Sequence, residues 1–173
     1  MENVYSLADF NDYKFLPSLT DTKQKTFKKK LSRQTKSKTL FSRPPKILLV
    51  EDNIIIQKVN IAMLTNLGCE VDLADNGLKA VSMFKNGYDL IFMDVGLPEL
   101  DGISATKVIR CNEPKNRPNI IAVLTAFGDT VEKKCLDAGA NGLYTKPLLQ
   151  NDLLEVLKYW LPHLLKTNNT ALN

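Results

Sequence analysis

Five residues with chemically active side chains stand at the ends of short apolar runs. In chain order they are Glu51, Asp52, Asp94, Thr125 and Lys146. Three carboxylates brought together repel one another, so such a group needs a compensating cation. An oxygen-only ligand set without His or Cys suits Mg²⁺ or Mn²⁺ rather than zinc. If these residues meet in space, they predict a divalent metal site with a lysine and a hydroxyl beside it.

This set of side chains is suited to phosphoryl transfer. An Asp carboxylate can attack phosphorus and form an acyl phosphate. A metal ion and a lysine neutralise charge on the transferred group, and a hydroxyl can donate a hydrogen bond to it. Asp94 is the expected nucleophile, and Glu51 with Asp52 are the expected metal ligands. Lys146 would pair with the phosphoryl group, and Thr125 would donate to it. The hypothesis depends on the grouping, because each residue alone fits an ordinary surface loop.

Strand-like and helix-like segments alternate five times from residue 46 onward. Short apolar runs predict strands at 47–50, 71–74, 90–93, 120–124 and 143–145. Helical spacing and turn residues predict helices at about 53–67, 77–86, 103–110, 129–138 and 151–165. The alternation predicts an α/β fold, a doubly wound five-stranded parallel sheet with helices on both faces. Ligands bind such sheets beyond the carboxyl ends of the strands, where the five residues are expected.

The first of these helices has clear start and stop signals. Asn53 can cap its beginning, and Gly68 is suited to end it. Five apolar positions fall at helical spacing and are predicted to form its buried face: Ile55, Val59, Ala62, Met63 and Leu67.

Charge divides the chain into two parts. Residues 1–45 hold ten Lys or Arg against four Asp or Glu, whereas the other 128 residues hold thirteen against fifteen. The stretch 22–43 is rich in Lys, Ser and Thr and poor in apolar residues, which predicts disorder. We expect a basic, mostly disordered extension at 1–45, a folded domain at 46–165 and a tail at 166–173. The more apolar stretch 4–19 is suited to docking onto another surface.

Composition excludes several classes of protein. No apolar run reaches the ~18 residues of a membrane helix, and acids interrupt the apolar residues at the N-terminus, unlike a signal peptide. The three cysteines are scattered without a CxxC spacing, which fits reduced thiols rather than a disulfide framework or a zinc site. We therefore expect a soluble, cytoplasmic protein.

Five stretches of sequence resemble, in order and spacing, the receiver domain of two-component response regulators. They are ILLVEDN (47–53), LGCEVDLADNGLKAV (67–81), YDLIFMDVGLPELDGISAT (88–106), IIAVLTA (120–126) and DAGANGLYTKPL (137–148). The resemblance covers about 46–165. It implies the flavodoxin-like strand order 2-1-3-4-5. It also implies a signalling phospho-acceptor, not an enzyme, that catalyses only its own phosphorylation and dephosphorylation.

The resemblance assigns roles to individual residues. Asp94 is implied as the phosphorylation site, and the backbone carbonyl of Gly96 as a further ligand of the metal. Lys146 is expected to be followed by Pro147 in a cis peptide bond. The wording DVGLPELDG, with VEDN and NGLKAV, is closest to receivers of hybrid sensor kinases or phosphorelays. That implies a phosphohistidine donor on a histidine kinase or a histidine phosphotransfer domain.

Two positions depart from the family's pattern, and a third concerns the lifetime of the acyl phosphate. Receivers commonly have Tyr or Phe three residues before the lysine, where this chain has Leu143 followed by Tyr144. A switch would then proceed through Thr125 and its loop. Hybrid-type receivers often have Asn where this chain has Ile56. Phe127 is predicted to shield the acyl phosphate from water and to lengthen its lifetime.

A phosphohydrolase of the haloacid dehalogenase type is the alternative from another class. Such enzymes also use a nucleophilic Asp, a Thr or Ser, a Lys and Mg²⁺. They need a second Asp two residues after the first, where this chain has Gly96. Their further acids come late in the chain, whereas this acidic pair comes early.

The output of the protein is a separate question. The basic segment 23–43 could bind nucleic acid or an anionic membrane surface, although its interspersed Ser and Thr favour a solvated linker. Because the eight residues 166–173 leave no room for an output domain, we expect the protein to act through protein contacts. It would serve as a phosphate shuttle or sink, or present the face between its fourth and fifth helices to a partner.

Overall fold

A five-stranded parallel sheet forms the centre of the protein. The computed structural model describes residues 40–126 and 128–166. The strands lie in the order β2-β1-β3-β4-β5, and neighbouring strands pair in parallel. They are β1 (Lys46–Val50), β2 (Glu70–Ala74), β3 (Leu90–Asp94), β4 (Ile121–Thr125) and β5 (Gly142–Thr145). The predicted flavodoxin-like, doubly wound fold and its strand order are confirmed.

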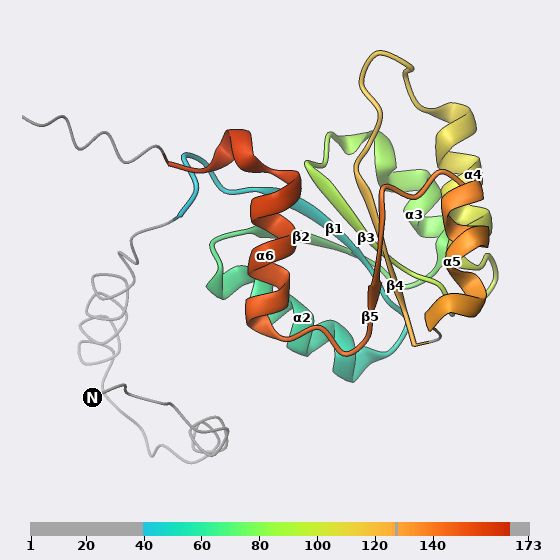
Figure 1. The fold of residues 1–173 in the computed structure, drawn as a ribbon, viewed down its shortest axis with the longest axis horizontal. Helices are drawn as coiled ribbons and strands as arrows, with labels where there is room; N and C mark the ends of the chain where they lie inside the picture. Colours follow the sequence, from blue (N-terminus) through green and yellow to red (C-terminus); the bar gives the residue numbers. More distant parts are fainter. Residues whose placement is uncertain (1–39, 127, 167–173) are drawn as a thin grey trace, which may run out of the picture. The chain divides into compact units, whose positions relative to one another are not determined.

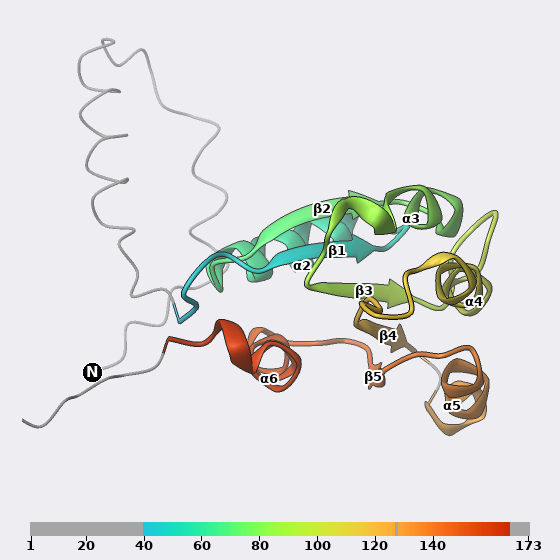
Figure 2. The same cartoon turned by 90° about the horizontal axis from the view of Figure 1, so that it is seen from above.

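Helices cover both faces of this sheet. They are α2 (Ile54–Asn66), α3 (Gly77–Met83), α4 (Gly102–Asn112), α5 (Gly128–Asp137) and α6 (Gln150–Trp160), with single 3₁₀ turns η3 (Phe84–Asn86) and η4 (Pro162–Leu164). Figure 1 shows α2 and α6 on one side of the strands and α3, α4 and α5 on the other. Seen from above in Figure 2, the strands run side by side with their carboxyl ends toward the same edge.

Burial on both faces explains why the strands read as unbroken apolar runs. In β1, Ile47 and Leu49 contact the core under α2 and α6, whereas Leu48 and Val50 contact the core under α3, α4 and α5. All four side chains are at most 1% exposed. Each residue of a central strand must therefore be apolar, whichever way its side chain points.

The predicted helix boundaries depend on caps and glycines that the structure confirms. Asn53 accepts hydrogen bonds from the N–H groups of Ile55 and Ile56 at the start of α2. Gly68, directly after the C-cap of α2, has a φ of 89°. That left-handed conformation carries little penalty for glycine and is a common way to end a helix.

The last helix is shorter than predicted. The expected helix at 151–165 is interrupted, because α6 ends at Trp160 and a separate 3₁₀ turn starts at Pro162. Leu161, which precedes the proline, has φ −121° and ψ 43°, outside the helical region. A proline ring disfavours helical backbone at the residue before it, which accounts for the break.

The buried face predicted for α2 is largely wrong. Ile55 and Val59 are 70% and 51% exposed, whereas the residues that α2 buries are Gln57, Asn60 and Leu64. Ala62 is also exposed, and Met63 and Leu67 are partly buried. Apolar residues occur nearly all round this helix, so their spacing does not define which side faces the sheet.

The folded part begins earlier than residue 46. Phe41 is 2% exposed within the core under α2 and α6, and it forms an antiparallel bridge with Leu165. Ser42 N–H donates to the Leu164 carbonyl over 2.7 Å. Residues 40–45 therefore do not belong to the predicted disordered extension, whose residues 1–39 lie outside the described residues, as does most of the tail.

Two expectations from composition can be compared with the described residues. The three cysteines are free, and Cys69 and Cys135 are buried. Within 40–126 and 128–166, none of the helices combines the length and apolarity needed to cross a bilayer.

Candidate phosphoryl-acceptor site

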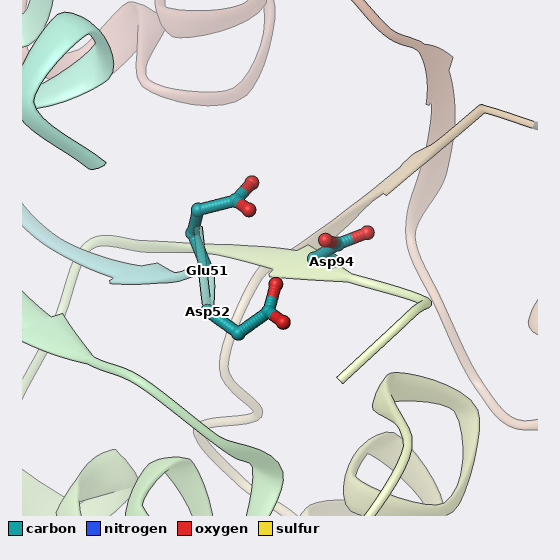
Figure 3. A group of neighbouring side chains, drawn as sticks. All are labelled: Glu51, Asp52 and Asp94. Carbon is teal, nitrogen blue, oxygen red and sulfur yellow. The ribbon is translucent and has the colours of Figure 1, made fainter. Parts of the chain in front are cut away.

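The carboxyl ends of the strands bring together the three predicted acids and Lys146, and Thr125 lies at the end of the neighbouring strand β4. The Lys146 Nζ lies 2.6 Å from a carboxylate oxygen of Glu51 and 2.6 Å from one of Asp94. The Lys146 N–H donates to the Thr125 carbonyl over 2.8 Å. One carboxylate oxygen from each of Glu51, Asp52 and Asp94 lies within 4.8 Å of the other two. Figure 3 shows these three carboxyl groups gathered at the ends of β1 and β3.

The loop between β1 and α2 holds the acidic pair by hydrogen bonds. Glu51 is 1% exposed, and its Oε1 accepts from the Asn53 N–H over 3.1 Å. The side-chain amide of Gln57 donates to the Glu51 carbonyl over 2.7 Å. Asp52, in contrast, is exposed. The loop thus fixes Glu51 inside the site and leaves Asp52 accessible to a ligand.

Asp94 is placed by β3 and by a close approach of α4. Its side chain accepts a hydrogen bond from the Gly96 N–H over 3.2 Å. Gly102, the first residue of α4, lies so near that a Cβ there would be 1.8 Å from the Asp94 carbonyl oxygen. Only glycine permits this approach, which explains why α4 begins with a glycine.

Lys146 is held between two acids. Burial alone would lower the pKa of Lys146, but the hydrogen bonds and charges of Asp94 and Glu51 outweigh burial and raise it. The lysine therefore stays charged at neutral pH. The peptide bond to Pro147 is cis, as the family resemblance implied.

The charge balance of the site favours a further cation. Among the residues described, Lys146 is the cation that pairs with this cluster of three carboxylates. The donors are all oxygens, and two of the three acids are buried. A small divalent ion with oxygen preference fits such a set, and it commonly retains water in its remaining positions.

Leu143 stands at the position, three residues before Lys146, where an aromatic residue is expected. Leu143 packs in the core under α3, α4 and α5, on the opposite face of β5 from Tyr144. The Tyr144 hydroxyl accepts a 2.7 Å hydrogen bond from the Trp160 indole N–H. Tyr144 is thus engaged with α6. Phe127 lies outside the described residues, so its predicted shielding role stays a prediction.

An apolar surface beside the site was not predicted from sequence. Ile54, Ile55 and Val59 of α2 are more than half exposed. Ile55 and Val59 line an apolar groove that also includes Pro147 and Leu149 from the segment after Lys146. The excess of apolar residues around α2 is the signal for this surface, although their helical spacing predicts that Ile55 and Val59 are buried.

Comparison with known proteins identifies the class to which this fold and site belong. Residues 47–158 match the response regulator receiver domain model. The chain therefore belongs to the family of receiver domains of two-component and phosphorelay signalling.

Two solved structures illustrate the relationship. The receiver domain of the sensor histidine kinase PA1611 from Pseudomonas aeruginosa PAO1, with magnesium coordinated in its active-site cleft, is 42% identical. It superposes with a TM-score of 0.62 over 68% of this chain and 97% of that chain. The Saccharomyces cerevisiae Ssk1 receiver, solved with the phosphotransfer protein Ypd1, is 35% identical, with a TM-score of 0.62 over 69% of this chain and 90% of that chain.

Curated relatives are much longer proteins. Transcription factor prr1 of Schizosaccharomyces pombe is 38% identical over 132 residues, which are 76% of this chain but 24% of the relative. The match to Dictyostelium discoideum hybrid signal transduction histidine kinase F covers 68% of this chain and 11% of that kinase. The likeness thus concerns the receiver and not the other parts of those proteins.

Proposed function

We propose that Asp94 accepts a phosphoryl group from a phosphohistidine, with Mg²⁺ or Mn²⁺ held by the acidic cluster. Glu51, Asp52 and Asp94 would supply carboxylate ligands, and the Gly96 carbonyl a backbone ligand. The observation that carries the proposal is the meeting of three carboxylates and Lys146 at the end of the sheet. The structure of a 42% identical receiver with magnesium in its cleft supports the choice of metal.

The chain's own groups account for the transfer. A carboxylate oxygen of Asp94 attacks the phosphorus, and the P–N bond breaks as the O–P bond forms. The imidazole nitrogen keeps the electron pair of the broken bond and takes up a proton. The Lys146 ammonium, which pairs with Glu51 and Asp94 in the structure, would pair with the phosphoryl oxygens. The Thr125 hydroxyl would donate a hydrogen bond to one of these oxygens. The bound metal would supply neutralisation of the charge that three acids and a phosphoryl group share.

The partner would dock on the apolar surface of α2. Ile54, Ile55 and Val59 are exposed on the helix that begins two residues after Asp52, so a protein bound there reaches the acidic cluster. The area is apolar, as the centre of an interface with a folded protein commonly is. A histidine kinase or a histidine phosphotransfer domain is the proposed donor, supported by the Ypd1 complex of a 35% identical receiver.

Other expectations on output remain proposals. Partner contacts through the face of α5 and α6 and a role of 23–43 with nucleic acid are separate from the chemistry at Asp94. Dephosphorylation by the chain itself would follow from water entering the same site. The haloacid dehalogenase alternative is not favoured, because the sequence and fold match the receiver family.

The test uses a small phosphodonor, which removes the need to know the kinase. The purified chain is incubated with acetyl phosphate and Mg²⁺, and its intact mass is measured. We expect a single phosphoryl addition that disappears in Asp94→Asn and on chelation of the metal. Asp137→Asn, at an exposed acid of α5, serves as the matched control and should be phosphorylated like the wild type.

Two results would contradict the proposal. An unchanged mass addition in Asp94→Asn would place the phosphoryl group elsewhere. Sustained turnover of p-nitrophenyl phosphate would favour a hydrolase instead. If neither result is obtained, phosphotransfer from a panel of kinases and phosphotransfer domains, with Asp94→Asn as control, would identify the donor.

A further inference from the structure

Gln57 is one of the two buried side-chain amides of α2. It lies in the first turn and a half of α2 and is 8% exposed. Its Nε2 donates a 2.7 Å hydrogen bond to the backbone carbonyl of Glu51, six residues earlier. Burying an amide costs free energy unless it is hydrogen-bonded, so this contact satisfies the side chain and links the helix to the loop before it.

The accepting carbonyl belongs to the peptide that joins Glu51 to Asp52. The other groups of Glu51 are held independently: its N–H donates to Ala74 of β2 over 3.1 Å. Its carboxylate accepts from Asn53 N–H and from Lys146. The orientation of the peptide plane is a separate degree of freedom, and it sets the direction in which Asp52 leaves the loop. The bond from Gln57 fixes that plane.

We propose that Gln57 is a positioning residue that aligns Glu51 and Asp52 for the metal. This inference rests on the proposed function, since it concerns the same acidic cluster. Gln57 contacts neither the carboxylates nor the reacting atoms, and it acts through the backbone of the loop. Removing the amide leaves every ligand in place but lets the peptide plane rotate, so metal binding must reorder the loop.

The second buried amide of α2 provides a matched control. Asn60 lies one turn further along the same helix and is 9% exposed. It lines the apolar groove rather than the loop. Gln57→Met removes the amide with similar length and volume, and Asn60→Leu does the same at the control position. Gln57→Leu is a second variant with a different shape, and circular dichroism establishes that each protein is folded.

The experiment measures Mg²⁺ affinity by calorimetry and hydrogen exchange of the Asp52 and Asn53 amides in the metal-free protein. We expect Mg²⁺ to bind about tenfold more weakly to both Gln57 variants, which is the effect usual for partners that orient metal ligands. The two amides should exchange faster without metal. At saturating Mg²⁺, the rate of phosphorylation by acetyl phosphate should return to nearly the wild-type value, because no reacting group is lost. Asn60→Leu should match the wild type in all three measurements.

The outcomes separate this inference from the proposed function. If wild-type protein binds Mg²⁺ and is phosphorylated while Gln57→Met and Gln57→Leu bind Mg²⁺ equally well, Gln57 has no positioning role. Equal weakening in Asn60→Leu would show a general effect of altering α2 and would also overturn the inference. If the wild type neither binds Mg²⁺ nor accepts phosphate, the proposed function itself fails.

Discussion

At the amino ends of the strands, the largely buried carboxylates of Asp89 and Glu113 are paired with arginines and N–H groups, whereas at the carboxyl ends Lys146 pairs with two carboxylates of a cluster of three. Asp89 illustrates the matched case. Arg43 donates to both of its oxygens over 2.7 Å, and the Lys46 N–H donates over 2.8 Å. Burial alone would raise the pKa of Asp89, but these bonds outweigh burial and lower it below its usual 3.8.

Glu113 is matched in the same way. It accepts from the Arg110 guanidinium over 2.7 Å and from the N–H and side-chain amide of Asn119. Burial alone would raise the pKa of Glu113, and the bonds from Asn119 and Arg110 outweigh burial and lower it. Arg110 also donates to the Gly139 carbonyl and to Asn141, so this ion pair joins α4 to the turn before β5.

The contrast separates structural charge from charge kept for a ligand. At the amino ends, Asp89 and Glu113 each have their own arginine and an N–H donor, so neither needs a further cation. At the carboxyl ends, Asp52 is exposed and Lys146 is divided between two acids. The excess negative charge there opposes folding, and a divalent ion would relieve it. Four measurements can test this contrast.

The largest expected effect comes from removing the cation at the amino end. Arg110→Ala leaves Glu113, whose side chain is 5% exposed, without its partner. Breaking a buried pair on one side commonly costs several kcal/mol, and we expect a loss of roughly 3 kcal/mol in the free energy of unfolding. Urea denaturation measures it. Lys133→Ala, which removes an exposed pair with Asp137, is the control and should change stability by less than about 0.5 kcal/mol.

Binding of Mg²⁺ should have the next largest effect on the free energy of unfolding. The ion should act only at the carboxyl ends of the strands. A ligand at a hundredfold excess over its Kd stabilises the folded state by about 2.7 kcal/mol. We expect a rise of that size in the wild type, measured by urea denaturation with and without Mg²⁺. Asp52→Asn should show little or none of it. Equal stabilisation of both proteins would mean that the ion binds elsewhere.

Asp89→Asn should lower the free energy of unfolding by a smaller amount, and this loss should depend on pH. The pKa of Asp89 is lower in the folded protein than in the unfolded chain. Its contribution is therefore complete above the unfolded pKa near 3.8 and disappears as pH falls through the lower folded value. We expect a loss of roughly 2 kcal/mol at pH 7 that shrinks below pH 3.8. A cost that is constant down to pH 2 would contradict the role of its charge.

The smallest effect should have the opposite sign. Asp52→Asn removes one of three mutually repelling carboxylates, whose oxygens lie within 4.8 Å of one another. Because Asp52 is exposed, the repulsion is moderated by water, and we expect the metal-free protein to gain roughly 1 kcal/mol. Thermal unfolding with a chelator present measures the gain. Destabilisation would show that Asp52 has a structural partner and that the contrast between the two ends is incomplete.

Much of the fold and the site was predictable because local signals and topology agree. The unbroken apolar runs of β1, β3 and β4 specify buried parallel strands, and Asn53 and Gly68 mark where α2 begins and ends. Once the strands are parallel, residues at their carboxyl ends must share one edge. That geometric rule alone predicts that Asp94 and Lys146 lie close together, as they do.

Other features were decided by tertiary packing. The spacing of apolar residues did not show which face of α2 is buried, because apolar side chains lie nearly all round it. The face was chosen by contacts with the sheet, which bury Leu64, and by the bond from Gln57 to the Glu51 carbonyl. Phe41 likewise lies in a polar stretch that reads as disordered, and its burial depends on pairing with Leu165.

By itself, then, the sequence determined the order of elements and the identity of the acidic cluster, since both follow from local patterns and chain order. The orientation of α2, its exposed apolar surface and the bond that aligns the acidic loop were decided only in three dimensions. They depend on contacts between residues whose types leave more than one arrangement open, and the free energy of the assembled core selects among them.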